Sequence, residues 1–87
     1  MQRVSIELPL PAYDGFIEQC DESSRPYAVL KNGVIFERRT KEQRLERVVK
    51  IECTVEDAEK LLFLAIKFCP EIVGDIARGI MIALKSD

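Results

Sequence analysis

The last third of the chain holds two apolar segments that a proline divides, and this feature constrains the fold most. Thr54 followed by Asp57 predicts a helix start, because a threonine cap and early acidic residues suit the positive end of the helix dipole. The apolar residues after Val55 cover well over half of the helical circumference. Pro70 ends or bends this helix, because its ring clashes with the carbonyl four residues back. We therefore predict two helices that meet at a corner at Cys69 and Pro70.

The segment after Pro70 also predicts a helix, with apolar residues over about half of its circumference. Helical spacing relates Ile72, Ile76, Ile80 and Ala83. The alternative is a strand over residues 79–84, which would complete a ferredoxin-like βαββαβ order. The helical spacing is the stronger pattern, so we predict a second helix.

A chain of 87 residues is short for two helices of this kind. A domain of this size buries only roughly 60–65% of its unfolded surface, so the chain cannot cover both helices on every side. We predict a homo-oligomer, most simply a dimer, in which a second copy covers the apolar surface. The candidate interface residues are Leu64, Phe68, Ile80, Met81 and Ile82. A different protein partner would fit the same surface, and in the alternative monomer the sheet and other helices enclose one of the two helices.

The N-terminal stretch RVSIELP, residues 3–9, alternates polar and apolar side chains, which predicts a strand with one buried face. Pro9 and Pro11 favour the end of this strand and the start of a helix. The apolar face of that helix comprises Tyr13, Phe16, Ile17 and Cys20. A short amphipathic helix is therefore expected directly after the first strand.

The middle of the chain contains Asn-Gly between two apolar runs, in YAVLKNGVIFE. Asn-Gly is the preferred loop of a type I′ hairpin, which predicts strands over residues 27–31 and 34–39. In the alternative, Ser24 caps a short helix that ends at Lys31, and Gly33 is its left-handed C-terminal residue. We favour the hairpin.

The next segment, TKEQRLERVVK, carries two conflicting signals. Thr40 and Gln43 have the form of a helical capping box. Residues 45–53, however, alternate as a half-buried strand does, and we predict the strand. The sequence as a whole predicts a single α+β domain over residues 1–87, with three or four mainly antiparallel strands in the order β-α-β-β-β-α-α.

Several kinds of chemistry lack their usual residues. The sequence has no histidine, which removes the commonest metal ligand and the usual general base near neutral pH. The three cysteines, Cys20, Cys53 and Cys69, have no zinc-site spacing, and their odd number argues against a disulfide framework. Cys69 alone has a context for reactivity, since a helix N-terminus at Pro70 would lower its thiol pKa. We expect no enzyme activity, no metal and no cofactor, and we interpret all three cysteines as buried side chains.

The pattern of charge and hydropathy favours a cytoplasmic protein. The polar alternation that begins at residue 2 is unlike a signal peptide. Charged residues and Pro70 interrupt the apolar C-terminal region before it reaches the roughly 20 apolar residues of a membrane span. We therefore expect reduced cysteines and no membrane partner.

A basic segment suggests a second kind of partner. Residues 38–50 carry six basic and two acidic side chains, a net of +4 in a chain of net charge −2. The candidate binding residues are Arg38, Arg39, Lys41, Arg44, Arg47 and Lys50. A basic hairpin can follow the phosphates of a nucleic acid, so a nucleic-acid-binding regulator is the alternative function. The low overall charge favours a solvated hairpin whose arginines pair with nearby glutamates.

RVSIELP followed by an amphipathic helix resembles the opening of ribbon-helix-helix repressors, over about the first 22 residues. In that family two such strands pair antiparallel and their outward residues contact bases. The resemblance implies base contacts for Arg3, Ser5 and Glu7 and a dimer core formed by Val4, Ile6 and Leu8. It ends at SSRPYAVLKNGV, where Pro26 and an Asn-Gly pair stand in place of the second helix.

Overall fold

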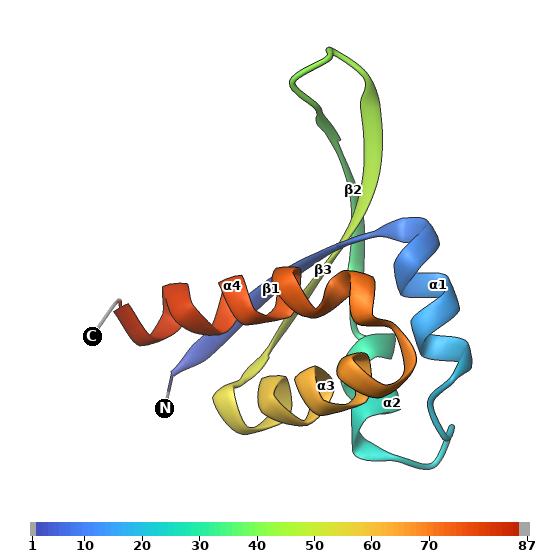
Figure 1. The fold of residues 1–87 in the computed structure, drawn as a ribbon, viewed down its shortest axis with the longest axis vertical. Helices are drawn as coiled ribbons and strands as arrows, with labels where there is room; N and C mark the ends of the chain where they lie inside the picture. Colours follow the sequence, from blue (N-terminus) through green and yellow to red (C-terminus); the bar gives the residue numbers. More distant parts are fainter. Residues whose placement is uncertain (1, 86–87) are drawn as a thin grey trace.

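The computed structural model describes residues 2–85 and has an α+β fold, with an antiparallel three-stranded sheet packed on helices (Figure 1). The elements are β1 (Arg3–Pro9), α1 (Leu10–Glu18), α2 (Arg25–Lys31), β2 (Val34–Arg39), β3 (Leu45–Thr54), α3 (Val55–Phe68), the 3-10 helix η1 (Pro70–Ile72) and α4 (Val73–Lys85). The strands lie in the order β1-β3-β2. The predicted fold class is confirmed. The ferredoxin-like alternative is wrong, because residues 79–84 lie within α4.

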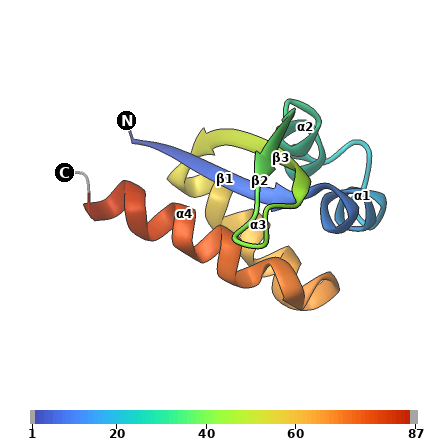
Figure 2. The same ribbon diagram turned by 90° about the horizontal axis from the view of Figure 1, so that it is seen from above.

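The core lies between one face of the sheet and the helices. Alternation in β1 buries Val4, Ile6 and Leu8, and the register places them opposite Cys53, Ile51 and Val49 of β3. The other face of β1 is exposed, as the sequence pattern predicts. Viewed from above in Figure 2, α3 and α4 lie on one side of the strands, with α1 at the end of β1.

The region around Asn-Gly differs from the prediction. Residues 27–31 are not a strand; they belong to α2, which Ser24 caps by accepting a hydrogen bond from the amide of Tyr27 at 3.3 Å. The alternative helix is therefore correct in its cap and its end at Lys31. Gly33 is not left-handed, however, because its φ is not positive. Position 33 instead has no room for a side chain, since a Cβ there would lie 2.5 Å from Cγ1 of Val49.

The hairpin in the sheet is formed by β2 and β3 instead. Thr40 donates its amide to the carbonyl of Arg44 at 2.9 Å, and Gln43 donates to the carbonyl of Thr40 at 3.0 Å. Gln43 has a φ of 65°, so it is the left-handed residue that closes the loop between the two strands. The capping-box helix over residues 40–50 is thus excluded, and the strand predicted at 45–53 is confirmed as β3. Figure 1 shows the hairpin projecting away from the helices.

The two predicted C-terminal helices are present, and their corner lies at Cys69 and Pro70. Thr54 caps α3 by accepting a hydrogen bond from the amide of Asp57 at 3.1 Å. α4 runs along β1 in both views (Figures 1 and 2). Gly79 allows this approach, because a Cβ at that position would lie 2.5 Å from the carbonyl oxygen of Ser5. β1 therefore contacts β3 and α4 of its own chain, unlike the β1–β1 pair of ribbon-helix-helix repressors.

Candidate functional site

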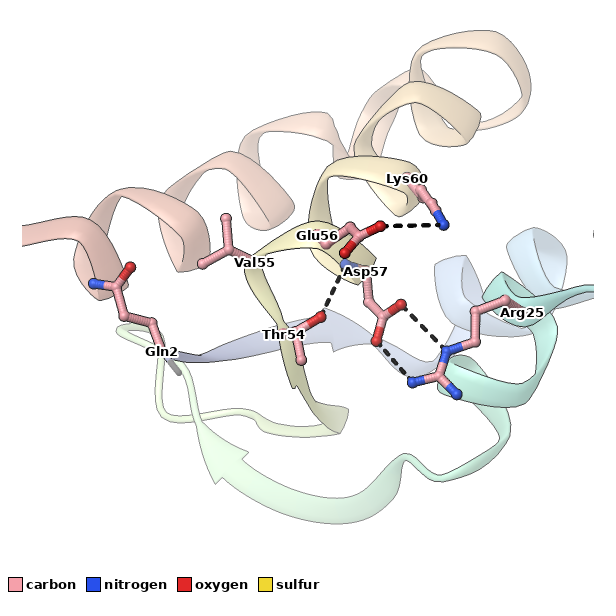
Figure 3. A pocket seen from close by; sticks show the side chains of 7 residues that line it. All are labelled: Gln2, Arg25, Thr54, Val55, Glu56, Asp57 and Lys60. Atoms are coloured by element: carbon pink, nitrogen blue, oxygen red, sulfur yellow. Dashed lines mark hydrogen bonds and ion pairs between the residues drawn. The ribbon is translucent and has the colours of Figure 1, made fainter.

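A shallow, open hollow lies where the start of α3 approaches α2 and the start of the chain (Figure 3). The side chains that line it are Gln2, Arg25, Thr54, Val55, Glu56, Asp57 and Lys60. The guanidinium of Arg25 donates two hydrogen bonds to the carboxylate of Asp57, at 3.2 and 3.0 Å. Nζ of Lys60 lies 3.8 Å from Oε1 of Glu56, which is one helical turn earlier in α3. The charged groups of the hollow thus pair with one another, and the Arg25–Asp57 pair joins α2 to α3.

Asp57 is the buried charged residue of this hollow, and its environment favours the ionised form. The hydrogen bonds from Arg25 lower the pKa of Asp57 below its ordinary value of 3.8, and Thr54 acts in the same direction. Burial opposes this shift. Because the folded-state pKa is depressed, the pair stabilises the fold above the ordinary carboxyl pKa, and this stability is lost as the pH falls through the folded value.

Arg25→Met should therefore lower the free energy of unfolding at pH 7 and have progressively less effect as the pH falls below 4. The arginine-to-methionine change removes the two donors but keeps a long side chain over the hollow. Urea unfolding of both proteins from pH 7 to pH 2.5 would measure the difference. Lys41→Met is the matched control, since it removes a cation from the exposed hairpin tip. A pH-independent difference would contradict the assigned role of Asp57.

The cysteines are free thiols in the described residues, and Cys53 and Cys69 are buried as predicted. Cys69 stands at the corner before η1, and its thiol donates a hydrogen bond to Oε1 of Glu71 at 3.3 Å. Burial and this bond raise the pKa of Cys69 above its ordinary value, and burial does the same for Cys53 and Cys20. The direction of this pKa shift is opposite to the lowering expected from a helix N-terminus at Pro70.

The six candidate basic residues are distributed over the hairpin rather than gathered in one patch. The guanidinium of Arg38 donates hydrogen bonds to the carboxylates of Glu7, at 2.9 Å, and Glu46, at 3.2 Å. Nζ of Lys50 lies 3.7 Å from Oε1 of Glu52. In the register of the sheet, Arg39 and Arg47 share one face, whereas Arg38 and Lys50 share the other. Lys41 and Arg44 are exposed near the turn. Two of the six charges are thus neutralised by carboxylates.

The candidate apolar interface residues divide into two groups. Leu64 and Ile80 are half-buried and pack against the core. Met81 and Ile82 are 57% and 61% exposed, and Phe68 is 41% exposed beside Lys67. The outward faces of α3 and α4 therefore carry part of the predicted surface.

The prediction missed other exposed apolar side chains that lie on these helices and in the sheet. They are Phe63, Ile66, Leu84, Val34, Ile35 and Leu45. Phe63 is the most exposed, at 69%. A helical projection centred on the buried Leu61 would have placed Phe63 and Ile66 opposite the core. Nothing in the sequence marks β2 as an edge strand, so the exposure of Val34 and Ile35 had no signal.

Within residues 2–85, no group of three or more metal-ligating side chains is close enough to hold an ion, and every buried polar side-chain atom has a hydrogen-bond partner. No helix in this range combines the length and apolar character required to cross a membrane. Comparison of the chain with protein-family models, with curated proteins and with solved structures finds no match.

Proposed function

We propose that this chain is a non-catalytic interaction domain that self-associates through the outward faces of α3 and α4. One observation carries the proposal: most of the large, exposed apolar side chains lie on these two adjacent helices. They are Phe63, Ile66, Phe68, Met81, Ile82 and Leu84. Exposed apolar side chains concentrated on neighbouring elements are typical of interaction surfaces.

The charges beside these residues fit a second copy of the chain. α3 carries Glu59 and Lys60 on its exposed side, and α4 carries Arg78 and Lys85 together with Asp75. A surface with both signs of charge can meet itself across a twofold axis without a large repulsion. The raised thiol pKa of Cys69 and the internally paired charges of the Arg25–Asp57 hollow support a non-catalytic role.

The proposal predicts that the wild-type protein is a dimer or larger at tens of micromolar. Light scattering after gel filtration would measure its mass. Met81→Glu and Ile82→Glu should each shift the population to smaller species by placing a carboxylate in the interface, while the circular dichroism spectrum stays unchanged. Gln19→Glu, which adds the same charge to the end of α1, should have no effect. A wild-type monomer in these conditions would refute the proposal.

Nucleic-acid binding by the hairpin is the second candidate. The observation in its favour is the projection of the hairpin beyond the helices, with exposed Arg39, Lys41, Arg44 and Arg47 (Figure 1). Binding should weaken steeply as salt rises, because phosphate contacts release counterions. A triple change of Arg39, Arg44 and Arg47 to serine should abolish it, whereas Lys85→Ser on α4 should not. Fluorescence anisotropy with labelled duplex DNA and RNA measures both effects, and salt-insensitive binding would count against this function.

A further inference from the structure

The two edges of the sheet differ in what covers them. β1 contacts α4 along its outer side, whereas β2 contacts β3 and has no other extensive contact within residues 2–85. β2 also carries two exposed apolar side chains, Val34 and Ile35, at 65% and 57% exposure. An uncovered edge strand presents backbone donors and acceptors to any strand that approaches it. β2 is therefore the part of the sheet that is available for pairing.

The register identifies which backbone groups face outward from β2. Thr40 and Arg44 form a hydrogen-bonded pair next to the turn, with the amide of Thr40 donating at 2.9 Å. Bonded and non-bonded pairs alternate along antiparallel strands, so Arg38, Phe36 and Val34 bond to β3. The amides and carbonyls of the intervening Ile35 and Glu37 then point away from the sheet. The same alternation applies to the pairing of β3 with β1. It indicates that the carbonyl of Ser5 points outward from β1, toward Gly79 of α4.

We propose that β2 pairs antiparallel with β2 of a second copy, across a twofold axis that passes between the two Phe36 residues. The product is a continuous six-stranded sheet. This surface is separate from the outward faces of α3 and α4, so the inference goes beyond the proposed function and does not depend on it. The occupant is a second copy because the reversed sequence of β2 brings Phe36 opposite itself and places no two like charges in opposition.

Charge selects the register. A twofold axis at Glu37 would oppose two glutamates, and an axis at Arg38 would oppose two arginines; like charges in direct opposition destabilise a strand pair. An axis at Ile35 would use only residues 34–36 of each strand before reaching Asn32, the C-terminal cap of α2. An axis at Phe36 pairs residues 34–38 of both copies and brings no two like charges opposite each other.

The Phe36 register also pairs the outward backbone groups of β2 and gives its side chains cross-strand neighbours. Ile35 of each copy lies opposite Glu37 of the other, and these are the residues whose amides and carbonyls face outward. Val34 lies opposite Arg38, whose guanidinium pairs with Glu7 and Glu46 of its own sheet and so brings no unpaired charge to the seam. Phe36 faces its symmetry mate in the closer, non-bonded pair, where cross-strand aromatic contacts are favourable. Val34 and Ile35, whose side chains lie on opposite faces of the sheet, each gain a cross-strand neighbour.

Disulfide trapping tests the register directly. In a non-bonded antiparallel pair the two Cα atoms are about 4.5 Å apart, within the range that a disulfide spans. Phe36→Cys should therefore form a covalent dimer under mild oxidation, at least about tenfold faster than Arg38→Cys, whose Cα atoms would be roughly 14 Å apart. The unsubstituted protein, with Cys20, Cys53 and Cys69 in place, gives the background rate. Faster cross-linking at Glu37→Cys than at Phe36→Cys, or background rates at both, would overturn the proposal.

A backbone substitution tests the pairing without a cross-link. Glu37→Pro removes an amide that faces the partner but does not bond to β3, and edge strands tolerate proline at such positions. Measured by sedimentation, its dimer dissociation constant should rise by about tenfold or more, while Glu37→Ala, which keeps the amide, stays near wild type. Both changes are made in a Met81→Glu background, so that association through α3 and α4 is already weakened. An unchanged constant in folded Glu37→Pro overturns the proposal, and if this variant unfolds, the cysteine comparison decides.

Discussion

Gly79→Ala should lower the free energy of unfolding by about 3 kcal/mol, because the added methyl group has no room between α4 and β1. Its Cβ would lie 2.5 Å from the carbonyl oxygen of Ser5 and 3.1 Å from Cγ1 of Ile6. The nearer atom belongs to the backbone of a paired strand, so it cannot move without disturbing the sheet. α4 must shift outward instead, which opens the core at Ile76 and Ala83.

Gly74→Ala is the matched control for this prediction, since it lies on the same helix and its Cβ would have no neighbour within 4 Å. Alanine is the better helix former, so this change should be neutral or add up to about 1 kcal/mol. Urea unfolding followed by circular dichroism measures both variants. Equal stabilities for the two would mean that α4 does not lie as close to β1 as described.

Phe16→Ala should cost about 4 kcal/mol, the range expected when a large buried aromatic side chain leaves a cavity. Phe16 is fully buried and is the buried residue of α1. The hydroxyl of Tyr13 also holds α1 to α2, because it donates a hydrogen bond to the carbonyl of Leu30 at 2.8 Å. Tyr13→Phe removes only that hydrogen bond and should cost about 1 kcal/mol.

Urea unfolding measures the stability of both variants, and amide hydrogen exchange separates the contributions of Phe16 and Tyr13 to holding α1. If Phe16 anchors the helix to the sheet, its replacement should also increase amide hydrogen exchange throughout α1, whereas Tyr13→Phe should affect the region near Leu30 more than the rest of the helix. A Phe16→Ala variant no less stable than Tyr13→Phe would show that α1 contributes little to the core.

The predictions that succeeded rested on patterns repeated over many residues or on a specific cap. Alternation over residues 3–9 predicted the buried face of β1, and Thr54 predicted the start of α3. In each case local preference and tertiary packing favour the same conformation. The strand predicted over residues 45–53 was also correct, because alternation over nine residues outweighed a capping-box pattern that involves only two.

The error at α2 had a tertiary cause. Asn-Gly favours a tight hairpin locally, but Gly33 serves a different purpose, since Val49 of β3 occupies the space where a Cβ would be. The contact joins residues far apart in the sequence, so no local pattern could reveal it. Ser24 did provide a local signal for the helix, and its cap proved more informative than the turn dipeptide.

The sequence predicted that the C-terminal helices would expose apolar faces, but it identified only some of the residues on those faces. An excess of apolar residues on both C-terminal helices predicted exposed apolar faces, and Met81 and Ile82 are indeed exposed. Leu64 and Ile80 pack inward, because the angle at which each helix meets its neighbours depends on the corner at Pro70 and on the approach at Gly79. Sequence periodicity gives the width of an apolar face and does not give its orientation.

The covering of β1 by α4 bears on how far strand pairing can extend. A sheet with two open edges can add copies without limit, as in amyloid growth, whereas a sheet with one open edge stops after a single addition. In the pairing proposed for β2, α4 would therefore block growth of the sheet at β1, and Gly79 lets α4 lie close enough to do so. Loosening α4 by Gly79→Ala should expose the edge of β1, and the same substitution that weakens the fold should then let strand pairing continue beyond two copies.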